Sequence, residues 1–319
     1  MINIPTYNIN NVEMCTFKCV KNYFIDFFYV HVHTLVHCVH KSLLRECHSH
    51  RFHSSPVRII RTESEQILAA EEISKLRASQ SPIAISVQRC PTWSSLAPLK
   101  FNGYWDNESK GNLINTGQTA YFTFDTRKQP RLSGGPLIGE YIFEQMHFHW
   151  SVDDFTGCEH VLDGHGYAAE CHMVHYNSKY ESMEAAVAHP DGLAVVGYLL
   201  EATDAPNPSF DTFVEGLESI RKPDNNTSVS AQSLAWMNRQ DVTTGSYVTY
   251  KGSLTTPPYT ECVTWIIFEK PVQIGSEQLS LLRQLEGSNS QLIERNVRPT
   301  QRHPPGHSVI YVKQVQSKL

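Results

Sequence analysis

The sequence predicts a mixed α+β protein that is mainly β, on three observations. After Gln80 the chain is divided into short stretches of alternating polar and apolar residues, separated by Gly, Pro and Asn, which is typical of half-buried strands. Helical spacing of apolar residues occurs in three short stretches. The 319 residues, 40% of them hydrophobic, suit one large domain or two small ones and can bury a core of useful size.

Charge and composition exclude several classes of protein. Lys and Arg total 27 against 32 Asp and Glu, so the net charge of −5 is small and of the wrong sign for a nucleic-acid surface. Seventeen Gly and 17 Pro without a period exclude collagen-like and low-complexity chains. We therefore expect a globular protein with no nucleic-acid partner.

Residues 1–61 differ in composition from the rest of the chain. They contain seven Lys and Arg against three Asp and Glu, and seven of the 16 histidines lie between positions 31 and 53. The apolar run from Tyr23 to Val39 includes Asp26 and several histidines, so it is a poor membrane span, and no cleavage-site pattern of a signal peptide follows it. We expect residues 1–61 to be an atypical, poorly ordered extension.

Local patterns place the first helix and the principal strands. Thr62 and Glu65 have the spacing of a capping box, and apolar residues then recur at helical spacing, which predicts a helix over 62–79 that leads into a domain over 80–319. Two further helices are expected near 210–220 and 276–285. Strands are expected at Ala120–Phe124, Tyr141–Trp150, Ala168–His175, Ala194–Leu200 and Cys262–Phe268.

Two of these strands carry the residues of a candidate metal site. Gln145, His147 and His149 share one face of their strand, because successive side chains alternate, and the two imidazoles lie about 7 Å apart along it. Glu170 and His172 share a face of another strand, so a neighbouring strand could supply a third imidazole. Three neutral histidines leave the fourth position of a tetrahedral Zn²⁺ open, as in catalytic zinc sites. Gln145 and Glu170 are placed to accept hydrogen bonds from ring N–H groups.

A His-x-His pair alone is a weak signal. His31 and His33 have the same spacing, but no carboxylate or third histidine on a neighbouring strand accompanies them. We interpret that pair as a consequence of local histidine enrichment.

The pair at 147 and 149 lies among further motifs that occur in a characteristic order. These motifs are Gln80 to Ile85, Asn115 to Gly117, Gly134 to Leu137, Gln145 to Trp150, Glu159-His160, Tyr167 to His175, Pro190 to Val195 and Gly252 to Pro258. In these segments and their order the chain resembles the α-class carbonic anhydrases over about 220 residues, a match too long to arise from one short motif by chance. The resemblance implies a single domain around a large, mostly antiparallel twisted sheet with short peripheral helices. It also implies reversible hydration of carbon dioxide to bicarbonate and a proton, by attack of a hydroxide bound to zinc in a conical cleft.

The resemblance assigns roles to individual residues. It makes His147, His149 and His172 the zinc ligands, with Thr255 orienting the hydroxide through a hydrogen bond to Glu159. Asn296 matches a late segment that supports the ligands. The implied carbon dioxide pocket contains Val174, Val195, Leu254, Val263 and Trp265 with Thr256 beside it, and Asn115 and Thr116 are implied polar residues of the cleft.

Two departures from the family pattern affect the expected activity. Fast members commonly place a proton-shuttling histidine where this chain has Gln118, and glutamine does not titrate. We therefore expect turnover limited by proton transfer, below the ~10⁶ s⁻¹ of the best carbonic anhydrases. The family also precedes Gln80 with a segment containing Trp and Tyr that covers the cleft edge, and no such segment is recognisable in residues 1–79.

The cysteines bear on the compartment. Eight cysteines include no C-x-x-C pair, and Tyr259 occupies the place of a disulfide cysteine in extracellular members that the chain resembles. With no signal peptide recognised, this favours a reducing compartment, the cytoplasm, with a mitochondrial or a secreted location as the open alternatives.

Two alternatives to a carbon dioxide hydratase stay open. One is a related binding protein without activity, and the other is ester hydrolysis by the same zinc centre. The oligomeric state is left open by the sequence.

Overall fold

More of the described residues lie in strands than in helices, as the sequence predicts. The computed structural model describes residues 62–94, 96–105, 109–238, 242–243 and 245–313. The strands are β1 Ala84–Ile85, β2 Thr92–Trp93, β3 Lys100–Asn102, β4 Lys110–Asn115, β5 Ala120–Asp125, β6 Arg131–Ser133, β7 Glu140–Trp150, β8 Val161–Leu162, β9 Ala169–Asn177, β10 Leu193–Thr203, β11 Asn226–Ser230, β12 Tyr247–Gly252, β13 Val263–Phe268, β14 Val272–Gly275 and β15 Val309–Val312. The five expected strands are β5, β7, β9, β10 and β13, with ends that differ by at most three residues.

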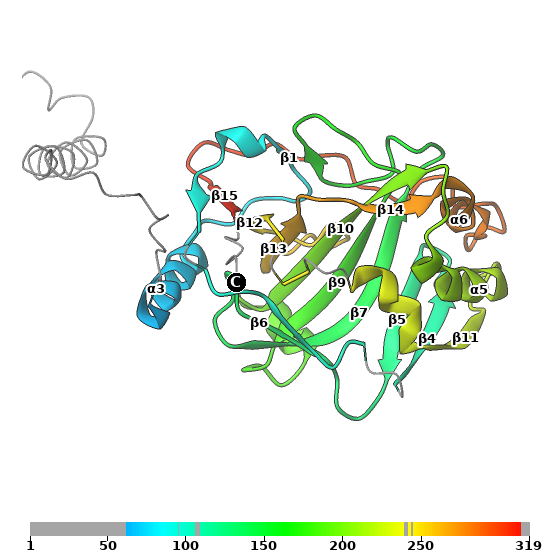
Figure 1. The fold of residues 1–319 in the computed structure, drawn as a ribbon, viewed down its shortest axis with the longest axis horizontal. Helices are drawn as coiled ribbons and strands as arrows, with labels where there is room; N and C mark the ends of the chain where they lie inside the picture. Colours follow the sequence, from blue (N-terminus) through cyan, green and yellow to red (C-terminus); the bar gives the residue numbers. More distant parts are fainter. Residues whose placement is uncertain (1–61, 95, 106–108, 239–241, 244, 314–319) are drawn as a thin grey trace, which may run out of the picture. The chain divides into compact units, whose positions relative to one another are not determined.

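One large twisted sheet organises these strands (Figure 1). Its order is β11-β4-β5-β7-β9-β10-β13-β12-β15-β2, with β14 paired to β10 and β6 joining β3 to β7, while β1 and β8 form a separate parallel pair. Within the described residues, nine pairings of the large sheet are antiparallel and three are parallel. The expected large, mostly antiparallel sheet is confirmed.

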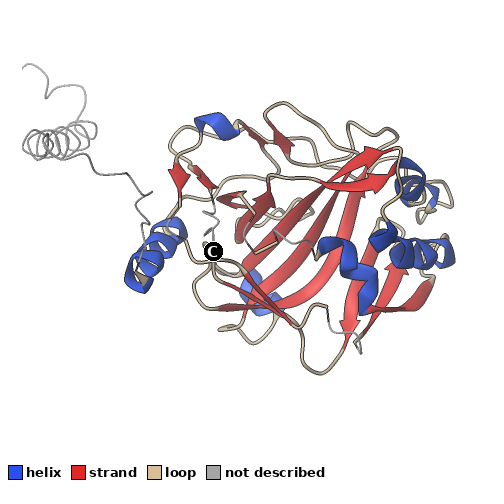
Figure 2. Ribbon diagram, viewed as in Figure 1, coloured by secondary structure: helices blue, strands red, loops and turns tan. Residues whose placement is uncertain are grey.

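Short helices lie at the periphery of the sheet (Figure 2). They are α3 Glu63–Ser74, α4 Met183–Val187, α5 Asp211–Ser219 and α6 Ser276–Ser280, with 3-10 turns η1 Val87–Arg89, η2 Pro208–Phe210, η3 Ala231–Met237 and η4 Leu282–Gln284. The predicted capping box of Thr62 and Glu65 begins α3. This helix ends before the expected Ser79, whose backbone N–H instead bonds to the carbonyl of Lys251 in β12. The helix expected over 276–285 is divided into α6 and η4.

Apolar side chains fill both faces of the sheet. One core cluster contains Tyr141, Phe143, Met146, Phe148 and Trp150 of β7 together with residues of α5 and η3. The ring of Phe148 lies 5.1 Å from that of Phe213 in α5 and 6.0 Å from that of Trp236 in η3, so these helices cover this face. A second cluster, from β9, β10, β12 and β13, packs on the opposite face.

A β-bulge in β7 decides which face the histidines occupy. Phe143 pairs with His175 and Gln145 with Val174, so Glu144 between them has no cross-strand partner. Before the bulge the odd-numbered residues are in the first core cluster, and after it the even-numbered residues are, because an extra residue reverses the alternation. Gln145, which is half-buried, and the two histidines therefore face away from that cluster.

The expectation for residues 1–61 lies outside the described residues. In the part of the chain that the structure does describe, no helix combines the length and the apolar character needed to cross a membrane.

Candidate metal centre

The candidate ligands lie on two adjacent strands, β7 and β9, and β10 lies next to β9. His147 on β7 is the cross-strand partner of His172 on β9, and His172 is in turn the partner of Gly197 on β10. A Cβ atom at Gly197 would lie 3.2 Å from Glu170 Oε1 and 2.6 Å from Ile267 Cδ1. Glycine therefore leaves room on β10 for the side chains of β9.

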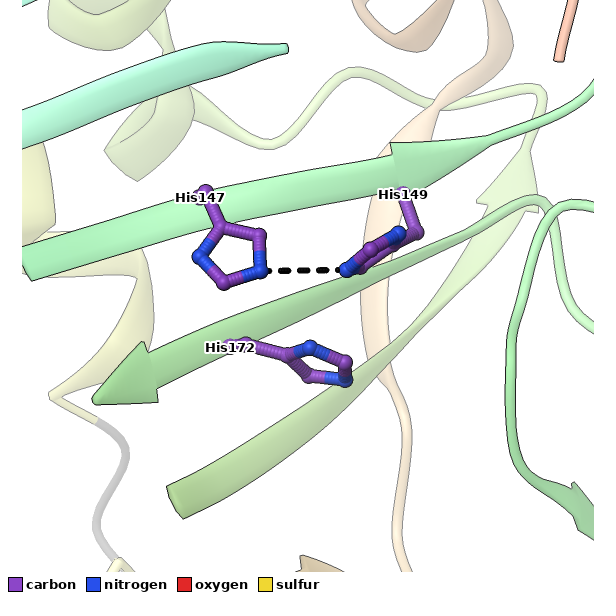
Figure 3. A group of neighbouring side chains, drawn as sticks. All are labelled: His147, His149 and His172. Atoms are coloured by element: carbon purple, nitrogen blue, oxygen red, sulfur yellow. Dashed lines mark hydrogen bonds between the residues drawn. The ribbon is translucent and has the colours of Figure 1, made fainter. Parts of the chain in front are cut away.

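The three rings of His147, His149 and His172 converge (Figure 3). One ring nitrogen from each lies within 4.8 Å of those of the other two. The Nε2 atoms of His147 and His149 are 3.1 Å apart. Tetrahedral zinc with Zn–N bonds of 2.0–2.1 Å requires nitrogens about 3.4 Å apart, so the spacing suits such an ion.

The opposite nitrogen of each ring is held by a hydrogen-bond acceptor. His147 Nδ1 donates to Gln145 Oε1 at 2.8 Å, and His149 Nδ1 donates to the backbone oxygen of Asn296 at 2.9 Å. His172 Nε2 donates to Glu170 Oε1 at 2.7 Å. Because each neutral imidazole has one N–H, these bonds leave Nε2, Nε2 and Nδ1 as lone-pair donors. Two facing lone pairs at 3.1 Å repel each other unless a cation lies between them, so the donor set fits a metal ion.

Burial favours the neutral form of His147 and His172. It lowers the pKa of His147 well below its ordinary value, with further lowering from His149 and His172. Burial also lowers the pKa of His172, although Glu170 acts in the opposite direction. Unprotonated imidazole is the form that binds a metal.

Glu170 connects the centre to a buried polar network. Its carboxylate accepts hydrogen bonds from His172, from His160 Nδ1 at 2.7 Å, and from the backbone N–H groups of Glu159 and His160. Burial acts to raise the pKa of Glu170, but the contacts with His160 and His172 hold it well below its usual range. His160 Nε2 lies 2.7 Å from the Tyr250 hydroxyl.

Sequence reasoning named His160 within a motif but gave neither His160 nor Tyr250 a role in the site. Spacing carries no signal for either contact, because His160 is ten residues from Glu170 and Tyr250 is 90 residues from His160.

The residues expected around the centre fall into different environments. Asn296 Nδ2 donates hydrogen bonds to the carbonyl oxygens of Gln118 and Phe148, which joins its segment to the end of β7.

Asn115 is 0% exposed, and its side-chain amide donates hydrogen bonds to the carbonyls of Arg221 and Glu286. Asn115 therefore supports loops and does not face a cleft, in contrast to the expectation. Thr116 and Gln118 are exposed.

The apolar residues of the implied pocket lie together beside the rings. Gln145, Val174, Val195 and Trp265 form a second row across β7, β9, β10 and β13. The ring of Trp265 lies 4.8 Å from that of His172. Val263 belongs to the same core cluster, and Leu254 packs against it.

Glu159 and Thr255, the two residues expected to orient the nucleophile, are both buried. Glu159 Oε1 accepts the backbone N–H of Arg298 at 2.8 Å and is 3.4 Å from His149 Nδ1. Glu159 Oε2 is buried and has no hydrogen-bond partner among the described residues. Thr255 is 8% exposed, and Thr256 next to it is exposed.

The fold and the site define a class of protein: one in which three histidines on adjacent strands of one large sheet could hold a metal ion beside a row of apolar side chains. An arrangement of three protein ligands with room for a fourth is typical of catalytic zinc. The histidines that could hold the ion are His147, His149 and His172.

Comparison with known proteins identifies the family. The family model for eukaryotic-type carbonic anhydrases matches residues 70–310. Carbonic anhydrase 3 of Bos taurus is 36% identical over 233 residues, which cover 70% of this chain and 85% of the bovine protein, and carbonic anhydrase 3 of Sus scrofa matches with the same values. The chain therefore belongs to the eukaryotic-type carbonic anhydrase family. It is an enzyme of the carbonate dehydratase class, a lyase that acts on small-molecule substrates.

Proposed function

We propose that this chain catalyses the zinc-dependent, reversible hydration of carbon dioxide to bicarbonate and a proton. The observation that carries the proposal is the convergence of three unprotonated ring nitrogens, each fixed by an acceptor on the other side of its ring. Zn²⁺ bound there would lower the pKa of a bound water from 15.7 to ~7, the value established for carbonic anhydrase itself, and so supply a nucleophile at neutral pH.

Thr255 and Glu159 orient the nucleophile in this proposal. In this proposal the Thr255 hydroxyl donates a hydrogen bond to Glu159 Oε2, a contact that the described structure does not itself form, and the hydroxyl oxygen is left to accept a hydrogen bond from the attacking group. The buried Oε2 atom without a partner supports this assignment, because burying an unpaired carboxylate oxygen is costly. The Arg298 N–H holds the other oxygen and so limits the rotation of the carboxylate.

The apolar row beside the rings suits carbon dioxide. The substrate has no net dipole, so it gains nothing from charged anchors and is best held by hydrophobic side chains. Val174, Val195 and Trp265 are at most 3% exposed, and Val174 and Val195 are partners in the row that begins at Gln145. We assign the substrate pocket to these residues together with Val263 and Leu254.

Proton transfer limits turnover in this proposal. Every hydration releases one proton, and Gln118 cannot accept it at the position where fast relatives of this family place a histidine. Gln118 is exposed to solvent, but its side-chain amide does not titrate and so cannot carry the proton.

Metal analysis combined with carbon dioxide hydration tests the proposed function. We expect about one zinc ion per chain, hydration activity, and loss of that activity with a zinc-binding sulfonamide. The variant His172→Ala should lose both zinc and hydration activity, because only two of the three imidazole ligands of a catalytic zinc site remain. Stoichiometric zinc without hydration would contradict the proposal and favour a non-catalytic binding protein. Ester hydrolysis without hydration would favour an esterase.

We also propose a reducing compartment, the cytoplasm. Cys90, Cys158, Cys171 and Cys262 are free thiols, and burial raises the pKa of Cys158 to about 12 and of Cys262 to about 11. Buried thiols of this kind are inert to oxidation and need no partner. Fractionation of cells that express the full chain measures the compartment directly.

A further inference from the structure

The proton released by hydration needs an acceptor, and the carboxylates on the histidine face are the candidates. Glu170 is fully buried and accepts four hydrogen bonds. Glu159 is 1% exposed and accepts the Arg298 N–H. Neither side chain can move between the centre and the solvent without breaking the contacts that orient the ligands or the nucleophile.

Glu144 is different because the β-bulge leaves it free. Phe143 and Met146 on either side are buried in the first core cluster, whereas Glu144 and Gln145 between them are half-buried outside it. The Glu144 carboxylate has no hydrogen bond or ion pair with the described residues. It can therefore exchange protons with water.

Glu144 is close to the ligands along the strand and across it. It is three residues from His147, at most about 10 Å along β7. Tyr121 on β5 is the cross-strand partner of His147, and its pKa is raised by burial and next by the charge of Glu144. Glu144 and Tyr121 thus lie near each other on the face that carries the ligands.

The surroundings of Glu144 favour its protonated form. Burial raises the pKa of its carboxyl, and the carboxylate of Glu184 in α4 raises it further. Glu184 itself has a lowered pKa because its side chain is bonded to Ser182, so it keeps its negative charge. Proton transfer is most efficient when the pKa of the acceptor approaches the working pH, and both effects raise the pKa of Glu144 toward neutral pH.

We propose that Glu144 is the proton-transfer group of this enzyme, accepting the proton released in the cleft and passing it to solvent. The inference rests on the proposed function. In each cycle the Glu144 carboxylate takes one proton from a cleft water and becomes a carboxylic acid. It returns to carboxylate by giving that proton to bulk water or buffer, and no electrons or other groups move.

Oxygen-18 exchange on the zinc-loaded protein tests the proposal, because it measures two rates. One is the interconversion of carbon dioxide and bicarbonate, and the other is the release of labelled water, which depends on proton transfer. In Glu144→Gln we expect unchanged interconversion but slower water release, by up to about 10²-fold, the lower end of what a positioned acid or base contributes. Imidazole buffer should restore the lost rate, and Glu144→Asp should retain part of it.

Glu140→Gln is the matched control. Glu140 is an exposed carboxylate on the same strand, paired with Arg131 at 3.0 Å, and its variant should leave both rates unchanged. A second readout does not depend on turnover. The pKa of the Glu144 carboxyl, followed by carbon-13 NMR, should lie above its ordinary range in the zinc-free protein and fall when zinc binds, because a nearby cation favours the carboxylate.

The outcomes separate the two proposals. Normal interconversion with unchanged water release in Glu144→Gln, or a Glu144 pKa that does not respond to zinc, would overturn the role of Glu144 and leave the proposed function intact. Absence of interconversion in the zinc-loaded parent protein would overturn the proposed function, and the role of Glu144 with it.

Discussion

Three chemically identical ligands are oriented by three different groups. A side-chain amide holds His147, a backbone carbonyl holds His149 and a carboxylate holds His172. Gln145 and Glu170 could be recognised in the sequence because each is two residues from its histidine on one strand face. The carbonyl of Asn296 belongs to a residue 147 positions from its partner, and any residue type has a carbonyl, so this contact has no sequence signal.

At the residue scale, Gln118→His should accelerate turnover. An imidazole titrates near pH 7 and is better matched to proton exchange than either an amide or a carboxyl. We expect turnover at low buffer concentration to rise by about 10-fold with kcat/KM unchanged. Stopped-flow hydration measures both parameters. If neither this variant nor imidazole buffer changed turnover, proton transfer would not be the limiting step.

At the scale of elements, the site depends on register. The bulge at Glu144 turns the histidines of β7 away from the core that α5 and η3 cover, and the pairing of β7 with β9 then places His147 beside His172. Strand alternation predicted the shared face of Gln145, His147 and His149 correctly, because all three lie beyond the bulge. The bulge itself was not predicted, since an extra residue is defined by the partner strand and not by its own sequence.

The proposed substrate pocket, in the row of side chains across β7, β9, β10 and β13, can be tested by a substitution at Val195. Val195→Tyr would put a large ring between Val174 and Trp265, its partners on β9 and β13, where the proposed substrate pocket lies. We expect kcat/KM for carbon dioxide to fall by about 10²-fold, the cost of misplacing a reactant by about 1 Å. Stopped-flow hydration measures the change, with zinc content and thermal melting as checks of the fold. Val195→Ala, which only enlarges the space, is the control, and an unchanged kcat/KM in Val195→Tyr would refute the pocket.

At the scale of the whole molecule, a buried neutral histidine ties stability to pH. His175 is 0% exposed, donates from Nδ1 to the carbonyl of Ala194 and accepts the Tyr104 hydroxyl at Nε2, 2.6 Å away. Burial lowers the pKa of His175 to about 4. Its neighbours include the rings of Phe143 and Tyr104. Protonation would place a charge in this aromatic core and remove the acceptor for Tyr104.

Acid should therefore destabilise the fold through His175. The unfolded chain binds the proton at its ordinary pKa near 6.5 and the folded chain only at about 4, so the stabilising contribution is complete above pH 6.5 and is lost as the pH falls to 4. The loss is about 3 kcal/mol. Denaturant unfolding at several pH values in this window should show a shallower decline for His175→Gln, whose amide does not titrate. Parallel curves for the two proteins would contradict this assignment.

The sequence by itself determined the periodicities, the capping box of α3 and the local pairs on single strand faces, because these depend on residues a few positions apart. It also carried enough ordered motifs to indicate the family before any fold was known. Only the tertiary structure decided that His149 is held by Asn296, that His160 shares Glu170 with His172, that Asn115 is buried, and that Glu144 lies free on the histidine face. Each of these contacts joins residues through strand pairing or loop packing, and burial and register are properties of the assembled sheet.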